Sequence, residues 1–126
     1  MHTTLVLHST PPSLNRASRS YWKYKWWKEH LQDDLEKTLL ATVGRRQFAP
    51  VVATASLRFP TRRRRDEGNF RALLEKSLGD AMVNGGWLPD DTPDWFRFGE
   101  CVFEIEPGPN RTTVILHEQE TGEQAS

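Results

Sequence analysis

Residues 66–91 read Asp66-Glu-Gly-Asn-Phe-Arg-Ala-Leu-Leu-Glu-Lys-Ser-Leu-Gly-Asp-Ala-Met-Val-Asn-Gly-Gly-Trp-Leu-Pro-Asp-Asp91, and they contain the clearest helix signal in the chain. Spacing of i, i+3, i+4, i+7 and i+8 indicates one buried stripe, formed by Phe70, Leu73, Leu74, Ser77, Leu78, Ala81 and Met82. Asp66 or Asn69 can cap the helix start, and Gly85-Gly86 end it. We therefore predict a helix from Asn69 to Asn84.

The rest of the chain supplies a second helix and four strands. A helix is predicted from Tyr21 to Val43, because apolar residues recur every four positions and Gly44 follows. Strands are predicted at about 3–8, 52–59, 98–106 and 112–117, the last two joined by the turn sequence Pro107-Gly-Pro-Asn110. The order β-α-β-α-β-β predicts an α+β fold, a small mixed β-sheet with two main helices packed on it. We expect one domain at 1–117 and a polar, frayed tail at 118–126.

Composition limits the class of protein. The 126 residues are 37% hydrophobic, which suits one domain with one core. The N-terminus has no basic region followed by an apolar run, and no stretch approaches 18 apolar residues, so we expect neither a signal peptide nor a membrane span. The single Cys101 favours a reducing cytoplasm, and the four scattered histidines argue against a zinc site. No small-molecule cofactor is expected.

The charges are divided unevenly along the chain. Residues 1–65 carry 13 Lys or Arg against 4 Asp or Glu, and residues 66–126 carry 4 against 13. Such asymmetry indicates a polyanion-binding half joined to an acidic half. The alternative is a neutral protein whose charges interleave after folding.

The acidic segment suggests chemistry. On the predicted helix, Asn69, Lys76 and Asp80 fall within about 40° of one another, and Lys76 and Asp80 are close enough to touch. Asp66 precedes this helix and Asp90-Asp91 follow it. Clustered carboxylates hold Mg²⁺, which activates water beside a phosphate, and a nearby lysine stabilises the developing charge. The alternative is a helix cap, a solvated ion pair and an ordinary turn.

Two basic segments could bind a nucleic acid. Arg62, Arg63, Arg64 and Arg65 are adjacent cations, which favours a match to a duplex backbone, with an exposed loop as the alternative. Further upstream, aromatic residues interleave with Arg16, Arg19, Lys23 and Lys25. This segment could track phosphates and stack on unpaired bases. Alternatively, Trp27 and another tryptophan join the apolar helix stripe, which leaves the Lys and Arg residues as the DNA contacts.

Three stretches together resemble the RusA family of Holliday-junction resolvases. They are Pro11-Pro-Ser-Leu-Asn-Arg16, then Arg62-Arg-Arg-Arg-Asp66-x-x-Asn69, and Lys76-x-x-x-Asp80-Ala81 running into Gly86-Trp-Leu-x-Asp90-Asp91. The resemblance implies a homodimeric endonuclease that cuts four-way DNA junctions, with Mg²⁺ as cofactor and Mn²⁺ as a substitute. It also implies a mixed sheet with helices, in agreement with the predicted order of elements.

The family motif assigns roles to particular residues. By this likeness Asp66, Lys76 and Asp91 are catalytic, and the metal is held by Asp66, Asp90 and Asp91. Asn69 and Asp80 would orient those groups. The chain departs from the motif at Gly68, where the family has a second acid, and in a spacing from Asn69 to Lys76 about one helical turn longer. Glu67 or Glu75 could take the place of the missing carboxylate.

Helix length raises a question about the acids at its two ends. A helix from Asn69 to Asn84 is about 24 Å long, so Asp66 and Asp91 meet only if the loop doubles back or a partner supplies one of them. We therefore hypothesise a two-fold dimer that sets Asp66 of one subunit near Lys76 or Asp91 of the other. Two other functions are compatible with the sequence: a catalytically impaired RusA-like DNA-binding protein, and a protein-interaction domain without a nucleic-acid role.

Overall fold

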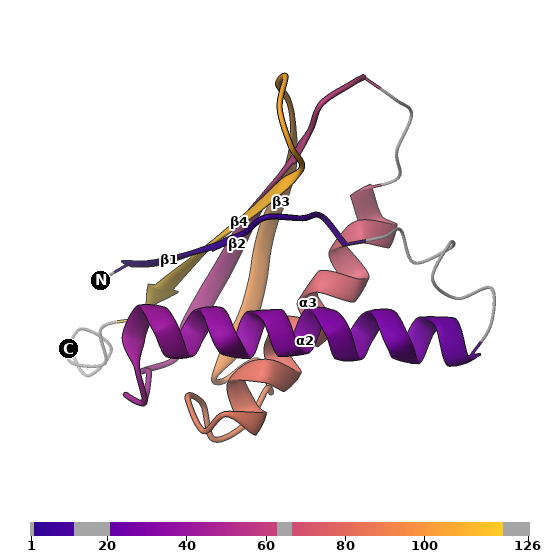
Figure 1. Cartoon of the computed structure of the whole chain (residues 1–126). Coiled ribbons are helices and arrows are strands. Elements are labelled where there is room, and N and C mark those ends of the chain that lie inside the picture. The colour runs from indigo at the N-terminus through magenta and orange to yellow at the C-terminus, as the bar shows by residue number, and fades with distance from the viewer. Residues whose placement is uncertain (1, 12–20, 63–66, 120–126) are drawn as a thin grey trace.

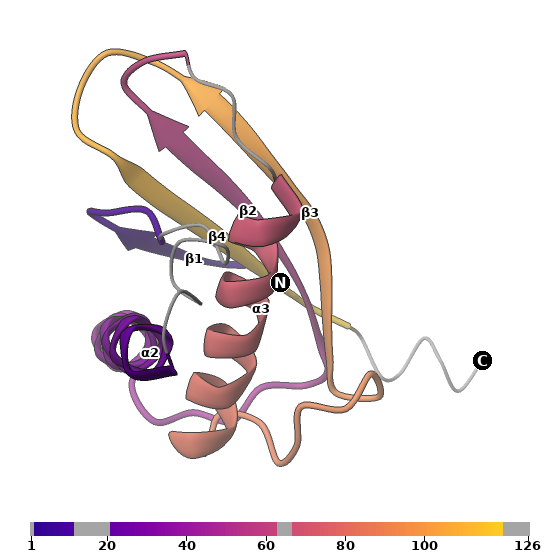
Figure 2. The same cartoon turned by 90° about the vertical axis from the view of Figure 1, so that its right-hand side faces the viewer.

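In a computed structural model of the chain, two α-helices cover one face of a four-stranded β-sheet (Figures 1 and 2). The structure describes residues 2–11, 21–62 and 67–119, without the side chains of 21 and 67–69. The elements are β1 (His2–Leu7), α2 (Tyr21–Val43), β2 (Val51–Phe59), α3 (Glu67–Asn84), β3 (Phe96–Ile105) and β4 (Arg111–Glu118). The predicted α+β class and the order of its elements are confirmed.

The sheet is mixed, with strand order β1-β4-β2-β3. β4 pairs antiparallel with both β1 and β2, whereas β2 and β3 are parallel, in a register that sets Val51 opposite Phe96. A parallel pair needs a crossover connection, and here α3 provides it. The two ends of α3 therefore connect to neighbouring strands of the sheet.

The core lies between the sheet and the two helices. Alternate residues of β2, from Val51 to Phe59, are buried, as expected for a strand with one covered face. The helices contribute Leu31, Leu35 and Leu39 from α2, and the whole predicted stripe from Phe70 to Met82 in α3. Each fully buried leucine contributes about 1.5–3 kcal/mol relative to an exposed one. Within the described chain, neither helix combines the length and apolar composition that crossing a bilayer requires.

Both helices end at a glycine with positive φ, as predicted from Gly44 and Gly85-Gly86. Gly44 has φ 67° and Gly86 has φ 80°, a region that L-residues with a Cβ avoid. The start of α3 differs from the prediction, because the helix already begins at Glu67. Asn69 thus lies inside the first turn and is not the cap, and Asp66 lies outside the described residues.

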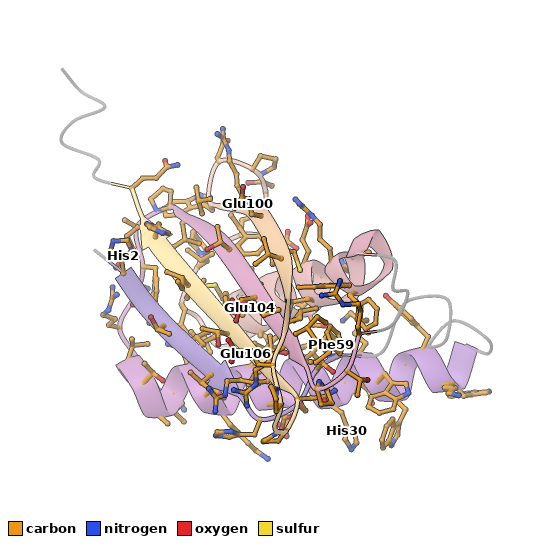
Figure 3. The ribbon with its side chains drawn as sticks, turned by 90° about the horizontal axis from the view of Figure 1, so that it is seen from above. His2, His30, Phe59, Glu100, Glu104 and Glu106 are labelled. Atoms are coloured by element: carbon orange, nitrogen blue, oxygen red, sulfur yellow. The ribbon has the colours of Figure 1, made fainter. Side chains whose placement is uncertain are left out.

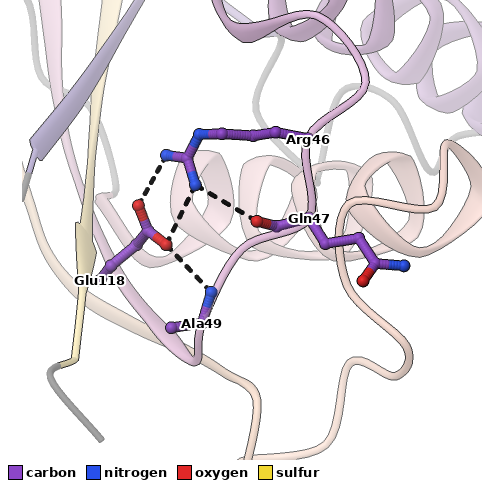
Figure 4. A network of polar contacts seen from close by, with 4 residues as sticks. All are labelled: Arg46, Gln47, Ala49 and Glu118. Carbon is purple, nitrogen blue, oxygen red and sulfur yellow. Dashed lines mark hydrogen bonds and ion pairs between the residues drawn. The ribbon is translucent and has the colours of Figure 1, made fainter.

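The last strand reaches further than predicted. Glu118 belongs to β4 and is not part of a frayed tail, because Arg46 and Ala49 bind its carboxylate (Figure 4). The Arg46 guanidinium donates hydrogen bonds of 2.6 and 3.2 Å to its two oxygens, and the Ala49 N–H donates one of 3.0 Å. This carboxylate therefore fastens the connection between α2 and β2 to the end of β4. Residues 120–126 of the expected tail lie outside the described part of the chain.

Candidate functional site

An open pocket of about 280 Å³ lies beside the middle of α3. Its lining comes from one face of the helix and from the segment that follows it: Ala72, Glu75, Lys76, Gly79, Asp91 and Phe96. The four helical residues share a face because they are spaced by three or four positions. The predicted residues Lys76 and Asp91, 15 positions apart in the sequence, therefore border the same cavity.

The loop after α3 is fastened at its first turn by Trp87. The backbone N–H groups of Trp87 and Leu88 donate to the carbonyl of Met82 over 2.9 and 3.1 Å. Both side chains are buried, and the Trp87 indole N–H donates to the carbonyl of Gly44 over 2.8 Å. The chain is thereby reversed directly beyond the helix, and the residues after Leu88 run back along α3.

Asp91 meets α3 at Gly79, where the helix has no side chain. A Cβ built at Gly79 would lie 3.5 Å from the Cβ of Asp91 and 3.4 Å from the ring of Phe96. These are ordinary contact distances, so the glycine allows the returning loop to lie close against the helix. The loop doubles back along α3 only as far as Gly79, in the fourth turn of the helix.

Asp80 is held between two lysines. Its carboxylate forms an ion pair of 2.6 Å with Lys28 of α2 and lies 3.6 Å from Lys76 on its own helix. The Asp80 side chain is 25% exposed and that of Lys76 is 57% exposed, so this pair is solvated on the lysine side, as in the alternative prediction, and partly buried on the aspartate side. Asp80 also borders a second cavity of about 320 Å³, together with Gln32, Val83, Asn84 and Asp91. Asp91 lines both cavities, and the Lys76–Asp80 contact links residues of the two, so Lys76, Asp80 and Asp91 lie close together.

The two neighbouring acids of the loop have different environments. Asp90 is exposed, accepts a hydrogen bond of 2.7 Å from the N–H of Asp91, and lines neither cavity. This local bond is typical of an aspartate that stabilises a turn. Of the predicted metal-binding pair, Asp91 is the residue that borders the site.

Glu75 is a second carboxylate on the wall of the first cavity. It lines the same cavity as Asp91 and forms an exposed ion pair of 3.6 Å with Arg71 one turn earlier. Arg71 is anchored in turn, because its guanidinium donates a 2.6 Å hydrogen bond to the carbonyl of Phe98 on β3. Glu75 is therefore the described acid best positioned to act with Asp91.

The donors around the first cavity fit a hard cation that shares its coordination with a ligand. Among the described residues, no three His, Cys, Asp or Glu side chains come together as a metal-binding group. Mg²⁺ needs fewer protein ligands than that, because it usually keeps several waters and binds one or two carboxylates plus phosphate oxygens. Asp91 and Glu75 supply two carboxylates at one open cavity, beside the ammonium group of Lys76.

Several predicted site residues lie outside the description. They are Asp66, the Arg63–Arg65 run, Arg16 and Arg19, together with the side chains of Glu67 and Asn69. Their assigned roles stay predictions. Arg62, Lys23 and Lys25 are described and exposed, as DNA contacts would have to be.

The length of α3 bears on whether Asp66 and Asp91, which flank the helix in the sequence, can meet within one chain. Gly79, where Asp91 meets the helix, follows Glu67 by 12 residues, which corresponds to about 18 Å of helix. The returning loop thus spans only the C-terminal part of α3. Asp91 lies far from the first turn of the same helix, next to which Asp66 stands in the sequence.

One feature of the site was missed at the sequence level. Lys28 is the closest partner of Asp80, yet 52 positions separate them and nothing local signals their contact. The exposure of Trp22 and Trp26 agrees with the period Trp27, Leu31, Leu35, Leu39, which leaves both residues off the apolar stripe. Trp27 does pack against the core as predicted, and Trp22 and Trp26 do not join it.

Comparison of the sequence with known proteins identifies no relative of this chain. The chain matches no family model, and no curated protein is similar to it. The resemblance to the RusA family therefore depends on the sequence motifs, and the site is interpreted from its own geometry.

Proposed function

We propose that the chain is a structure-selective DNA endonuclease resembling RusA, which hydrolyses phosphodiesters at four-way junctions with Mg²⁺. One observation supports this proposal: Asp91 of the returning loop lines one cavity with Lys76 and a second with Asp80, although the three residues come from separate parts of the motif. A cation and carboxylates around an open cavity suit a phosphodiester, which is anionic and is hydrolysed by an activated water.

Lys76 is the residue that would contact the phosphate. Lys76 lines the cavity and is more than half exposed, so its ammonium group could attract a phosphate and stabilise the negative charge that develops during displacement. Asp80 is a positioning residue, because its carboxylate lies 3.6 Å from Lys76. Lys28 pairs with the same carboxylate from α2, so Asp80 is shared between two lysines and neutralises Lys76 only in part.

Asp91 would hold the metal, with Glu75 as the second carboxylate in the position left open by Gly68. A bound Mg²⁺ supplies activation of a water and polarisation of a phosphate oxygen. Asp91 is suited to this task because Gly79 lets its loop lie against the helix while the cavity stays open to solvent. Asp66 would add a further carboxylate, and Asp90 would keep the loop turn in place.

The basic half of the chain would hold the DNA backbone. Arg62 and the run that follows it, Lys23 and Lys25 on α2, and Arg16 and Arg19 before α2 supply the cations. Phosphate contacts of this kind make binding strongly dependent on salt, with a slope close to the number of neutralised phosphates. Contacts to phosphates carry no sequence information, so they suit a protein that recognises a branched DNA shape and not a base sequence.

A homodimer would place two such sites on one junction. Along α3, about 18 Å separate Glu67 from the helix turn that Asp91 contacts, which favours a partner as the source of the first acid. Two-fold symmetry relates the two subunits and matches the paired cuts that a four-way junction requires.

Mixing Asp66→Asn and Asp91→Asn subunits tests this arrangement. Recovery of activity in the mixture supports shared sites, and none in any mixture refutes them.

The decisive experiment uses a labelled four-way junction, with and without Mg²⁺. We expect paired nicks only with the metal, and a loss of about 100-fold in cleavage rate for Asp91→Asn. Asp94→Asn is the matched control, since Asp94 is an exposed acid three residues further along that lines neither cavity. Junction binding by both variants should stay within about twofold of the wild type at fixed salt. Equal cleavage by wild type and Asp91→Asn would refute the proposed site.

A second candidate is a DNA-binding protein without nuclease activity. Gly68 favours it, as does the lack of a three-residue metal-binding group among the described side chains. It predicts salt-dependent junction binding and no nicks at any concentration of Mg²⁺ or Mn²⁺. A protein-interaction domain would bind no DNA even at low salt, so the same assay separates the three functions.

A further inference from the structure

Three aromatic rings form a row on the outer face of α2, here termed the aromatic ladder: Trp22, Trp26 and His30. They are spaced by four residues and therefore lie one above another along the helix. The Trp26 and His30 rings are stacked, with centroids 4.0 Å apart and planes 29° from parallel. Trp22 is 73% exposed and Trp26 49% exposed. Figure 3 shows His30 at the outer margin of the molecule, away from the sheet.

The ladder is held in place although it is exposed. Trp26 makes an edge-to-face contact with Trp27, whose ring centroid lies 4.7 Å away at an angle of 83°. Trp27 packs against the core, so it fixes one side of Trp26. Large aromatic side chains are seldom exposed in a contiguous row, and such patches mark sites of interaction. A rigid exposed ring loses little conformational entropy when another ring stacks on it.

The surroundings of the ladder are cationic. Residues 21–30 include Lys23, Lys25 and Lys28 and one acid, Glu29, whose carboxylate lies 3.9 Å from the ammonium group of Lys25. The ammonium group of Lys25 lies 5.7 Å from the centre of the Trp22 ring. Protein interfaces are enriched in tryptophan but depleted of lysine, whereas sites for single-stranded nucleic acids combine aromatic platforms with cations that follow the backbone. The combination of charge and aromatic surface therefore favours a nucleic acid over a protein partner.

The ladder is separate from the candidate active site. Trp26 precedes Lys28 by two residues, or about 200° around the helix, so the two side chains leave α2 on nearly opposite sides. Lys28 faces Asp80 of α3, and the first turns of α2 extend beyond α3 (Figure 1). DNA on the ladder would thus run along the outer side of α2, away from the cavity that Lys76 and Asp91 line.

We propose that the aromatic ladder is a stacking site for unpaired bases of DNA. Trp22 and Trp26 stack on the bases, and Lys23 and Lys25 bind the flanking phosphates. This inference depends on the proposed DNA-binding function and extends it. It assigns a second contact, to a strand other than the one cleaved, and it predicts that the protein distinguishes unpaired from paired DNA.

The test measures affinity by fluorescence anisotropy for an unstructured single strand, a fully paired duplex and a four-way junction, all at one salt concentration. The double variant Trp22→Ala/Trp26→Ala should bind the single strand at least tenfold more weakly, because base stacking on these rings is lost. Its affinity for the duplex should change less than about twofold, since no phosphate contact is removed. Leu40→Ala is the control, a 43% exposed residue on the same helix, and it should change neither affinity.

A second variant guards against a folding defect. Trp22→Phe/Trp26→Phe keeps aromatic faces and should recover most of the affinity for the single strand, with a circular dichroism spectrum like that of the wild type. Unchanged single-strand binding by the alanine variant, or equal losses on the single strand and the duplex, would overturn the stacking site. The stacking site would also be overturned if the wild type is a dimer that the alanine substitutions convert to monomers without changing the affinity for any of the three DNAs. A wild-type protein that binds none of the three DNAs refutes the proposed function itself.

Discussion

Lys28 of α2 and Asp80 of α3 form an ion pair of 2.6 Å where the two helices cross. Their side chains are 21% and 25% exposed, so solvent screens the pair only in part. The same carboxylate lies 3.6 Å from Lys76, the predicted phosphate ligand. This pair therefore links the packing of the two helices to the position of a candidate catalytic group.

Removing either partner of this ion pair should destabilise the protein. We expect Lys28→Met or Asp80→Asn to lower the free energy of unfolding by about 1–2 kcal/mol, since each change leaves a partly buried charge without its partner. The double variant should lose less free energy of unfolding than the sum of the losses of the two single variants. Urea unfolding measures all three. The exposed pair Lys37–Asp33, at 2.8 Å but with side chains 74% and 61% exposed, is the control. Its coupling energy should stay below about 0.5 kcal/mol.

Two glycines near the end of α3 should respond to alanine in opposite directions. Gly79→Ala should raise the free energy of unfolding by about 0.5–1 kcal/mol, because a helix interior favours alanine and the new Cβ makes ordinary contacts at 3.4–3.5 Å. Gly85→Ala should destabilise, because its Cβ would lie 1.9 Å from an atom of the buried Trp87 ring. Thermal unfolding compares the two variants. A loss of stability at Gly79 would mean that the Asp91 loop lies closer to the helix than the distances of 3.4–3.5 Å, so that a Cβ does not fit.

The helices of this fold could be predicted from the sequence almost to the residue. Tyr21–Val43 was predicted with the bounds that the structure shows, because a period of four in apolar residues and a terminal glycine are local signals. The strand ends differ from the prediction by one or two residues, because contacts with distant parts of the chain decide where a strand ends. At the end of β4, for example, Arg46 and Ala49 bind the carboxylate of Glu118.

The candidate site could be predicted only in part, because its geometry depends on distant contacts. The i, i+4 pair Lys76–Asp80 follows from helix geometry and is confirmed at 3.6 Å. Lys28 could not be assigned to this site, since it comes from another helix. The contact between Asp91 and Gly79 could not be predicted either. It depends on a hydrogen bond from the Trp87 indole to the carbonyl of Gly44, 43 positions away.

Ser77 lies in the buried stripe of α3 and should tolerate alanine well. Its side chain is fully buried, and within the described part of the chain its hydroxyl has no hydrogen-bond partner. An unsatisfied buried hydroxyl costs about 1–3 kcal/mol, and alanine also has the higher helix propensity. Ser77→Ala should therefore raise the free energy of unfolding by about 1 kcal/mol, as measured by urea titration. Ser56→Ala is the comparison. It removes a 2.6 Å hydrogen bond to Glu104 on the open face of the sheet and should not stabilise the protein.

The stability that Glu118 contributes should disappear in acid. The Arg46 hydrogen bond holds the pKa of the Glu118 carboxyl below its usual value of 4.5, and the N–H of Ala49 acts in the same direction against the opposing effect of burial. A carboxyl with a lowered pKa in the folded state stabilises that state above the pKa of the unfolded chain, and this contribution falls as pH drops through the folded pKa.

Glu118→Gln should accordingly destabilise the protein by about 1–2 kcal/mol at pH 7, where two charge-assisted hydrogen bonds from Arg46 are weakened. The difference in free energy of unfolding between wild type and variant should shrink below pH 4.5 and vanish once the carboxyl is protonated in both states. Urea unfolding at a series of pH values between about 3 and 7 measures this difference. Glu100→Gln, at an exposed residue of β3, should show a small difference at every pH. A gap for Glu118→Gln that stays constant across the series would mean that the contact with Arg46 does not depend on the charge of the carboxylate.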